Sequence, residues 1–180
     1  MPLPLPLPMP PRSRHRLWRP FAGLLLGGSA ALAQAGVVEV RFVDPDHYRD
    51  VRDAHFVRAD IEQPLTAHLQ ALADKLLEAQ QRLEIEVIDL DLAGEIEPVG
   101  PRLQQLRVMR SHTWPRITLR YTLRSGDGTA LRSAELRLSD VNYMENARLG
   151  SVGDPLRYEK QMLTDWFRRE FGPSHSADSR

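Results

Sequence analysis

The sequence predicts an α+β domain in which about four strands form one mixed sheet and two helices cover the same face of it. Three observations support this class: alternation of apolar and polar residues in four segments, helical spacing of apolar residues in two others, and the order strand-helix-strand-strand-strand-helix. The first two strands are joined through a helix and are expected to lie parallel, whereas the last two are expected to form an antiparallel hairpin. A single domain is therefore expected over residues 36–172, followed by a disordered tail over 173–180.

The first strand is expected over Val37–Val43, which ends at the turn sequence Asp44-Pro45-Asp46. Residues 47–61 alternate in charge and are interpreted as a surface loop. Pro64 suits the first turn of the helix that follows, which is expected to end near Gln80. Its buried face consists of leucines at helical spacing, namely Leu65, Leu69, Leu72 and Leu76.

The second strand, Leu83–Leu92, changes its apolar face between Val87 and Ile88. This change predicts either a β-bulge or a strand whose second half is buried on both faces. Residues 95–106 contain two prolines and a glycine, and they are interpreted as a connecting loop.

The third strand, Arg116–Arg124, alternates cleanly, and Ser125-Gly126-Asp127-Gly128 predicts a tight turn into the fourth strand, Ala130–Leu138. Residues 139–153 are expected to form a second long loop. Asp154 is the expected N-cap of the last helix, with Pro155 at its first position and Gly172-Pro173 at its end. The residues expected on its buried face are Leu156, Met162, Leu163, Trp166, Phe167 and Phe171.

The N-terminal residues 1–35 have the parts of a signal peptide behind a Pro/Leu-rich leader. Four arginines precede a short apolar run over residues 21–33, and cleavage is expected after Ala33 or Ala35. The alternative is a buried core helix, but three glycines and the lack of a polar face disfavour it. The sequence therefore predicts a periplasmic protein, and it leaves Met1 and Met9 both open as the start.

Removal of this leader changes the charge of the chain. The balance of 24 basic and 24 acidic residues becomes 20 against 24, because the leader has four arginines and no acid. A net charge near −4 argues against nucleic acid as a partner. Because the chain has no cysteine, it has neither disulfides nor a lipid-modified cysteine, and no stable membrane anchor is expected. No cofactor is expected either.

Several segments of the chain resemble one known family. They include Trp114-Pro115-Arg116-Ile117, Leu138-Ser139-Asp140-Val141-Asn142-Tyr143 and Asp154-Pro155-Leu156-Arg157-Tyr158-Glu159-Lys160. These segments are similar to exported bacterial proteins of the domain-of-unknown-function family 3016, over about Val37 to Phe171. The resemblance implies a cell-envelope setting and supplies no activity, substrate or catalytic residue.

One candidate site is the pair Asp89 and Asp91, whose carboxylates share a strand face about 7 Å apart. Such a pair could hold a hard cation in a small metal-dependent hydrolase, with His47, His55 or His112 brought near by folding. The alternative is that both are solvent-facing residues opposite a buried strand face. The histidines lack the spacing of zinc enzymes, and His68 is expected to pack at the edge of the core.

A second candidate is the arginine stripe Arg116, Arg120 and Arg124, on the sheet face that the helices leave open. It could bind anionic groups. Alternatively, the arginines pair across the strands with Glu84, Glu86 and Glu135.

The third candidate is the segment Ser139–Lys160, which could form a polar pocket at a helix N-terminus. Its candidate residues are Asn142, Tyr143, Asn146, Arg157, Tyr158 and Glu159. Alternatively, these residues cap, turn and pack. With the arginine stripe, this segment predicts a non-enzymatic binding or envelope-accessory module whose partner is an anionic envelope component or another periplasmic protein.

Overall fold

The computed structural model describes residues 36–48, 58–146 and 153–173. The predicted leader, residues 174–180 of the predicted tail, and most of the predicted surface loop lie outside these residues. Within them no helix is long and apolar enough to cross a membrane.

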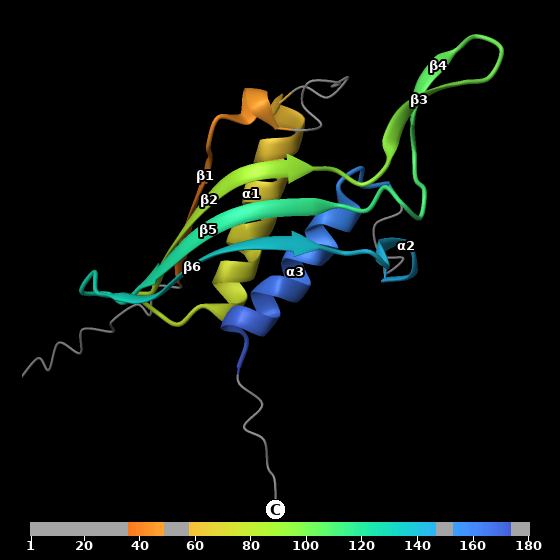
Figure 1. Ribbon diagram of the computed structural model, residues 1–180. Helices are drawn as coiled ribbons and strands as arrows, with labels where there is room; N and C mark the ends of the chain where they lie inside the picture. The colour runs from red at the N-terminus through yellow and green to blue at the C-terminus, as the bar shows by residue number, and fades with distance from the viewer. Residues whose placement is uncertain (1–35, 49–57, 147–152, 174–180) are drawn as a thin grey trace, which may run out of the picture. The chain divides into compact units, whose positions relative to one another are not determined.

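Four strands form one mixed sheet in the order β1-β2-β5-β6 (Figure 1). The strands are β1 (Val37–Phe42), β2 (Arg82–Asp91), β5 (Arg116–Arg124) and β6 (Ala130–Ser139). β1 pairs parallel with β2, whereas β5 pairs antiparallel with both β2 and β6. The α+β class, the four-stranded mixed sheet and the direction of each pair are as the sequence predicts.

The face change within the second strand is a β-bulge. The register of β2 against β5 shifts between Val87 and Asp89, so Ile88 is the extra residue. Leu83, Ile85 and Val87 are buried before the bulge, and Leu90 is buried after it. The bulge therefore returns the apolar side chains to one core face, and the first of the two predicted explanations is confirmed.

Two helices, α1 (Arg58–Leu76) and α3 (Arg157–Phe171), cover the same face of this sheet (Figure 1). Leucines of α1 and aromatic residues of α3 share one hydrophobic core with the inward-facing residues of all four strands. Tyr121 of β5 is buried in this core, and its ring centroid lies 5.8 Å from that of Trp166 and 5.4 Å from that of Phe171.

Both helices begin elsewhere than the sequence predicts. α1 starts at Arg58, so Pro64 lies inside the helix and residues 58–61 do not belong to a loop. The extension buries Ile61, one turn before Leu65. This burial stabilises the longer helix although Pro64 has no N–H to donate to the helix. Asp154 does not cap α3, whose N-cap is Leu156. Asp154 forms a turn instead, because its Oδ1 accepts the Leu156 N–H at 2.9 Å.

The sequence predicts a connecting loop over residues 95–106, and this prediction is wrong. The segment forms the greater part of a β-hairpin. β3 (Glu95–Val99) pairs antiparallel with β4 (Gln104–Val108), and together they form a separate two-stranded sheet. The alternation is missing from the sequence because no side chain of these two strands is fully buried. The second expected loop also contains one helical turn, α2 (Tyr143–Asn146).

Candidate functional site

The β3–β4 hairpin leads away from the four-stranded sheet (Figure 1). It exposes apolar side chains. Val99, Leu103 and Leu106 are 37%, 68% and 48% exposed. Residues 98–106, which we call the hairpin tip, contain one charged residue, Arg102, and no acid. An apolar, weakly basic tip is unusual on a domain with an acidic balance, and it is a candidate contact surface.

The backbone of Leu103, one of the exposed residues of the hairpin tip, is strained. Its φ of +47° is left-handed, and its N–H donates to the Gly100 carbonyl at 3.1 Å to close the turn. This conformation costs a residue with a Cβ about 1 kcal/mol. A bulky apolar side chain thus occupies a strained, exposed position where glycine or asparagine would be easier, and such outliers are more frequent at functional positions.

The other end of the hairpin is held firmly by polar contacts. Arg110 donates two hydrogen bonds to Glu97 of β3, from Nε at 2.8 Å and from Nη2 at 2.7 Å. The buried Tyr143 of α2 donates its hydroxyl to the Arg110 carbonyl at 2.8 Å. Gly94, with a φ of +84°, turns the chain out of β2 into the hairpin. The apolar tip is therefore carried on a fixed base.

The most constrained residue of this base is Glu159, in the first turn of α3. Its side chain is fully buried, and its Oε1 accepts the Ala93 N–H at 2.7 Å and lies 3.3 Å from Nη2 of Arg107 in β4. Its Oε2 has no hydrogen-bond partner. Burial raises the pKa of Glu159, although the nearby Arg107 charge and the Ala93 N–H act against this. Glu159 thus joins α3, the end of β2 and the hairpin at one buried point.

The predicted arginine stripe is already engaged with acids. Arg120 contacts Glu86 of β2 at 3.0 Å and Glu135 of β6 at 2.7 Å, and Arg124 contacts Glu84 at 3.1 Å. Arg116 contacts Asp91 at 2.6 Å and stacks over Trp114 at 4.5 Å from the ring centroid. The predicted cross-strand pairing is confirmed. Arg41 of β1 also contacts Glu86, so the ion pairs join all four strands of the sheet.

Asp89 and Asp91 have separate partners in the sheet. Asp89 accepts the Leu90 N–H at 3.0 Å, and Asp91 lies beside Arg116. Among the described residues, no group of three or more His, Asp or Glu side chains could hold a metal ion. His47 lies 2.8 Å from Asp44, and His55 lies outside the described residues. His68 packs against α3 as expected, with its Nε2 2.9 Å from the Lys160 carbonyl and 2.8 Å from Thr164 Oγ1.

The predicted site residues of the 139–160 segment gather beside the hairpin base. Tyr143 and Tyr158 are buried with Ala93 and stack edge to face at 4.7 Å. Arg157 lies over the Tyr158 ring at 4.4 Å and donates to its hydroxyl at 2.8 Å. The N–H of the exposed Asn142 donates to Asp140 Oδ1 at 3.1 Å. The tyrosines therefore position the hairpin, and their rings are not open to a ligand.

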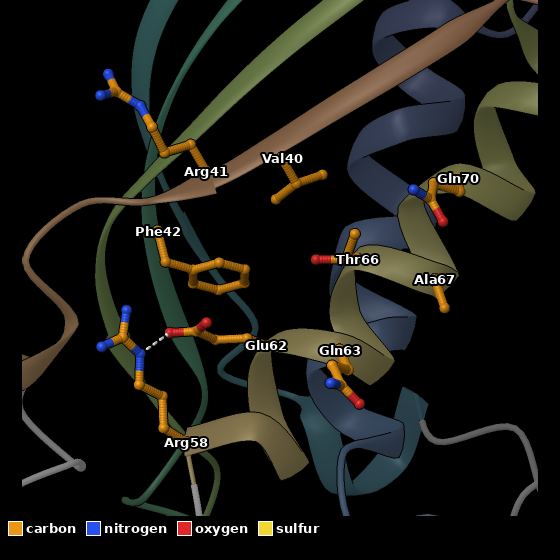
Figure 2. A pocket seen from close by; sticks show the side chains of 9 residues that line it. All are labelled: Val40, Arg41, Phe42, Arg58, Glu62, Gln63, Thr66, Ala67 and Gln70. Carbon is orange, nitrogen blue, oxygen red and sulfur yellow. Dashed lines mark hydrogen bonds and ion pairs between the residues drawn. The ribbon is translucent and has the colours of Figure 1, made fainter.

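A groove of about 450 Å³ lies along the other edge of the sheet, between β1 and α1. In Figure 2 the Val40 and Phe42 side chains point into this space, whereas Arg41 points away from it. Arg58 and Glu62 pair with each other at 2.5 Å at one end of the groove. The α1 residues along the rest of it are uncharged, namely Gln63, Thr66, Ala67 and Gln70.

Sequence reasoning includes Glu159 among its candidates but misses its burial, and it misses the hairpin tip altogether. A signal for Glu159 was present, since it precedes Met162 by three residues and Leu163 by four and so falls on the buried stripe of α3. No comparable signal marks Leu103, because exposed strands lack an apolar period.

These features define a class of protein: a small helix-covered sheet with an apolar-tipped hairpin on a fixed base and an open groove along one edge strand. The chain belongs to the family of proteins of unknown function DUF3016, whose model matches residues 36–169. The resemblance read from the sequence segments is thereby confirmed. No curated protein sequence and no solved structure matches the chain significantly.

Proposed function

We propose that the chain is an exported, non-enzymatic accessory module of the cell envelope that touches anionic lipid surfaces through the hairpin tip. The observation that carries this proposal is the exposure of Val99, Leu103 and Leu106 around one arginine, with no acid between residues 98 and 106. Apolar side chains enter the acyl boundary, while a basic residue favours anionic headgroups. The signal-peptide pattern of residues 1–35 supports a periplasmic location beside such membranes.

The expected contact is weak and reversible. Full burial of a Leu or Val side chain contributes about 1.5–3 kcal/mol, and the three side chains begin about half exposed, so their transfer provides about 3 kcal/mol together. This is less than one myristoyl chain provides, which itself binds membranes only marginally. The module would therefore sample a membrane without being anchored to it.

Vesicle flotation tests the proposal. The chain as isolated from cells is mixed with vesicles of phosphatidylcholine alone or with phosphatidylglycerol added. We expect flotation with the anionic vesicles, and we expect Leu103→Asp to abolish it. Leu131→Asp is the matched control, because Leu131 is also exposed, at 54%, but lies on β6.

Arg102→Glu should lower flotation with anionic vesicles and leave any flotation with neutral vesicles unchanged. The proposal is wrong if the wild-type chain floats with neither vesicle, or if Leu103→Asp floats as well as Leu131→Asp. If the tip binds a protein instead of lipid, the wild-type chain should float with neither vesicle.

A further inference from the structure

The outer edge of β1 has backbone groups that form no hydrogen bond with another described residue. In the parallel β1–β2 pair, Val37 and Val43 donate their N–H groups to Gln81 and Val87, each at 2.9 Å. Backbone groups of alternate residues point to opposite sides of a strand, so those of Val38, Val40 and Phe42 point away from β2. No hydrogen bond from a described residue satisfies them.

β1 lacks two features that often protect an edge strand, a proline and a bulge, and Val37 is exposed. Its two charged residues, Glu39 and Arg41, have opposite signs. The Val40 side chain lines the groove beside this edge, opposite Thr66 of α1 (Figure 2). This edge can accept one further strand, whose backbone would pair with the outward groups of β1.

We infer that the strand added here is β1 of a second copy, so that two copies pair antiparallel about Val40 and form one continuous eight-stranded sheet. The order of charges along β1 selects this occupant. With Val40 opposite Val40, Glu39 of each copy lies opposite Arg41 of the other. Val38 then lies opposite Phe42, and every outward N–H and C=O of these three residues finds a partner.

Neighbouring registers are worse. Pairing centred on residue 39 places two glutamates opposite each other, and pairing centred on residue 41 does the same with two arginines. Glu39 has no ion-pair partner among the described residues, whereas Arg41 already contacts Glu86 and keeps further donors, its side chain being largely exposed. The pairing centred on Val40 therefore gives each Glu39 an ion-pair partner and leaves the Arg41–Glu86 contact intact.

The helix beside the edge is compatible with a two-fold axis. The residues of α1 that line the groove away from the Arg58–Glu62 pair are uncharged, so two copies of α1 can approach without like-charge repulsion. A two-fold axis requires such a self-complementary surface, in which each copy offers the same patch. The β1 edge meets this requirement in its charges, its backbone and its neighbouring helix face.

Cross-linking at a single site tests the geometry. Because the chain has no native cysteine, Val40→Cys introduces the only thiol. The pair at residue 40 would have a Cα–Cα separation near 5.5 Å, which suits a disulfide. We expect a covalent dimer after mild oxidation. Leu131→Cys, on the opposite edge strand β6, is the control and should give no covalent dimer, although its unchanged β1 should still pair without a covalent bond.

Charge exchange tests the register by sedimentation. Glu39→Arg should weaken the dimer roughly tenfold or more, since both cross-strand pairs become repulsive. The variant should keep its fold, because residue 39 neighbours Glu84 on β2. Adding Arg41→Glu should restore most of the affinity. The inference is overturned if the wild-type chain is monomeric, if Val40→Cys cross-links no better than the control, or if Glu39→Arg dimerises like the wild type.

Discussion

Removal of the Glu159 side chain should loosen the base of the hairpin. In Glu159→Ala, the buried Ala93 N–H loses its acceptor and Arg107, whose side chain is 11% exposed, loses its carboxylate. An unsatisfied buried donor costs about 1–3 kcal/mol, and breaking a buried ion pair costs about 3–5 kcal/mol. Because these costs overlap at one carboxylate, we expect a loss of about 3 kcal/mol in the free energy of unfolding.

Glu159→Gln separates charge from shape. It keeps an acceptor for the Ala93 N–H but removes the ionisation of the residue. The pKa of Glu159 is raised in the folded state, so the folded protein binds the proton more tightly than the unfolded chain does. The wild type should therefore lose stability relative to Glu159→Gln as the pH rises above about 4.5, until the carboxyl is ionised in the folded state too.

Both the stability loss of Glu159→Ala and the pH dependence of Glu159→Gln can be measured by urea unfolding at several pH values between 4 and 8, with tryptophan fluorescence as the signal. The reasoning about the base is refuted if Glu159→Ala stays within about 1 kcal/mol of the wild type, which is far below the expected cost. The assignment of the raised pKa is refuted if the stability difference between the wild type and Glu159→Gln does not change with pH.

Three further predictions concern packing and pH. Gly36→Ala should cost about 2 kcal/mol in chemical unfolding, because a Cβ there would clash with the Cβ of Leu77, the residue after α1, and would lie 2.9 Å from the Glu78 carbonyl oxygen. Gly153→Ala, with open space around it, should be neutral. Gly94→Ala should destabilise more than Gly100→Ala: both residues have positive φ, but only the Cβ at residue 94 would meet neighbours, at 2.8 Å; equal melting temperatures would contradict this. Burial lowers the pKa of His68, so its contribution to stability should decline as the pH falls below about 6.5, and His68→Gln should show a smaller acid loss in thermal melts.

Patterns that record burial predicted the main sheet well. The clean alternation of Arg116–Arg124 and the face change at Ile88 both reflect one buried face, and both lead to the observed strands and bulge. Even the pairing of Arg120 with Glu86 and Glu135 follows once the strands are in register. Local sequence patterns are enough to predict the structure where the burial of a side chain depends only on its position along one strand or helix.

Features that depend on a third element were not predictable in this way. The start of α1 is moved by the burial of Ile61 against the sheet, which outweighs the local preference of Pro64 for a first turn. The exposed strands of the hairpin are held by contacts such as Glu97–Arg110 and Tyr143–Arg110, whose partners come from distant segments. The groove follows from which strand ends up at the edge, and sequence order does not give that directly.

The beginning of β1 has a consequence for the timing of maturation. Val37 already donates to the Gln81 carbonyl, and Gly36 packs so tightly that no Cβ fits. The fold thus begins one residue after Ala35 and three residues after Ala33, the two expected cleavage positions, so at most two residues lie between them. On the proposed export route, a peptidase needs these residues extended and accessible. Their strand partner, Arg82, is 45 residues away and emerges later, so cleavage and the closing of the sheet compete for the same short stretch of chain.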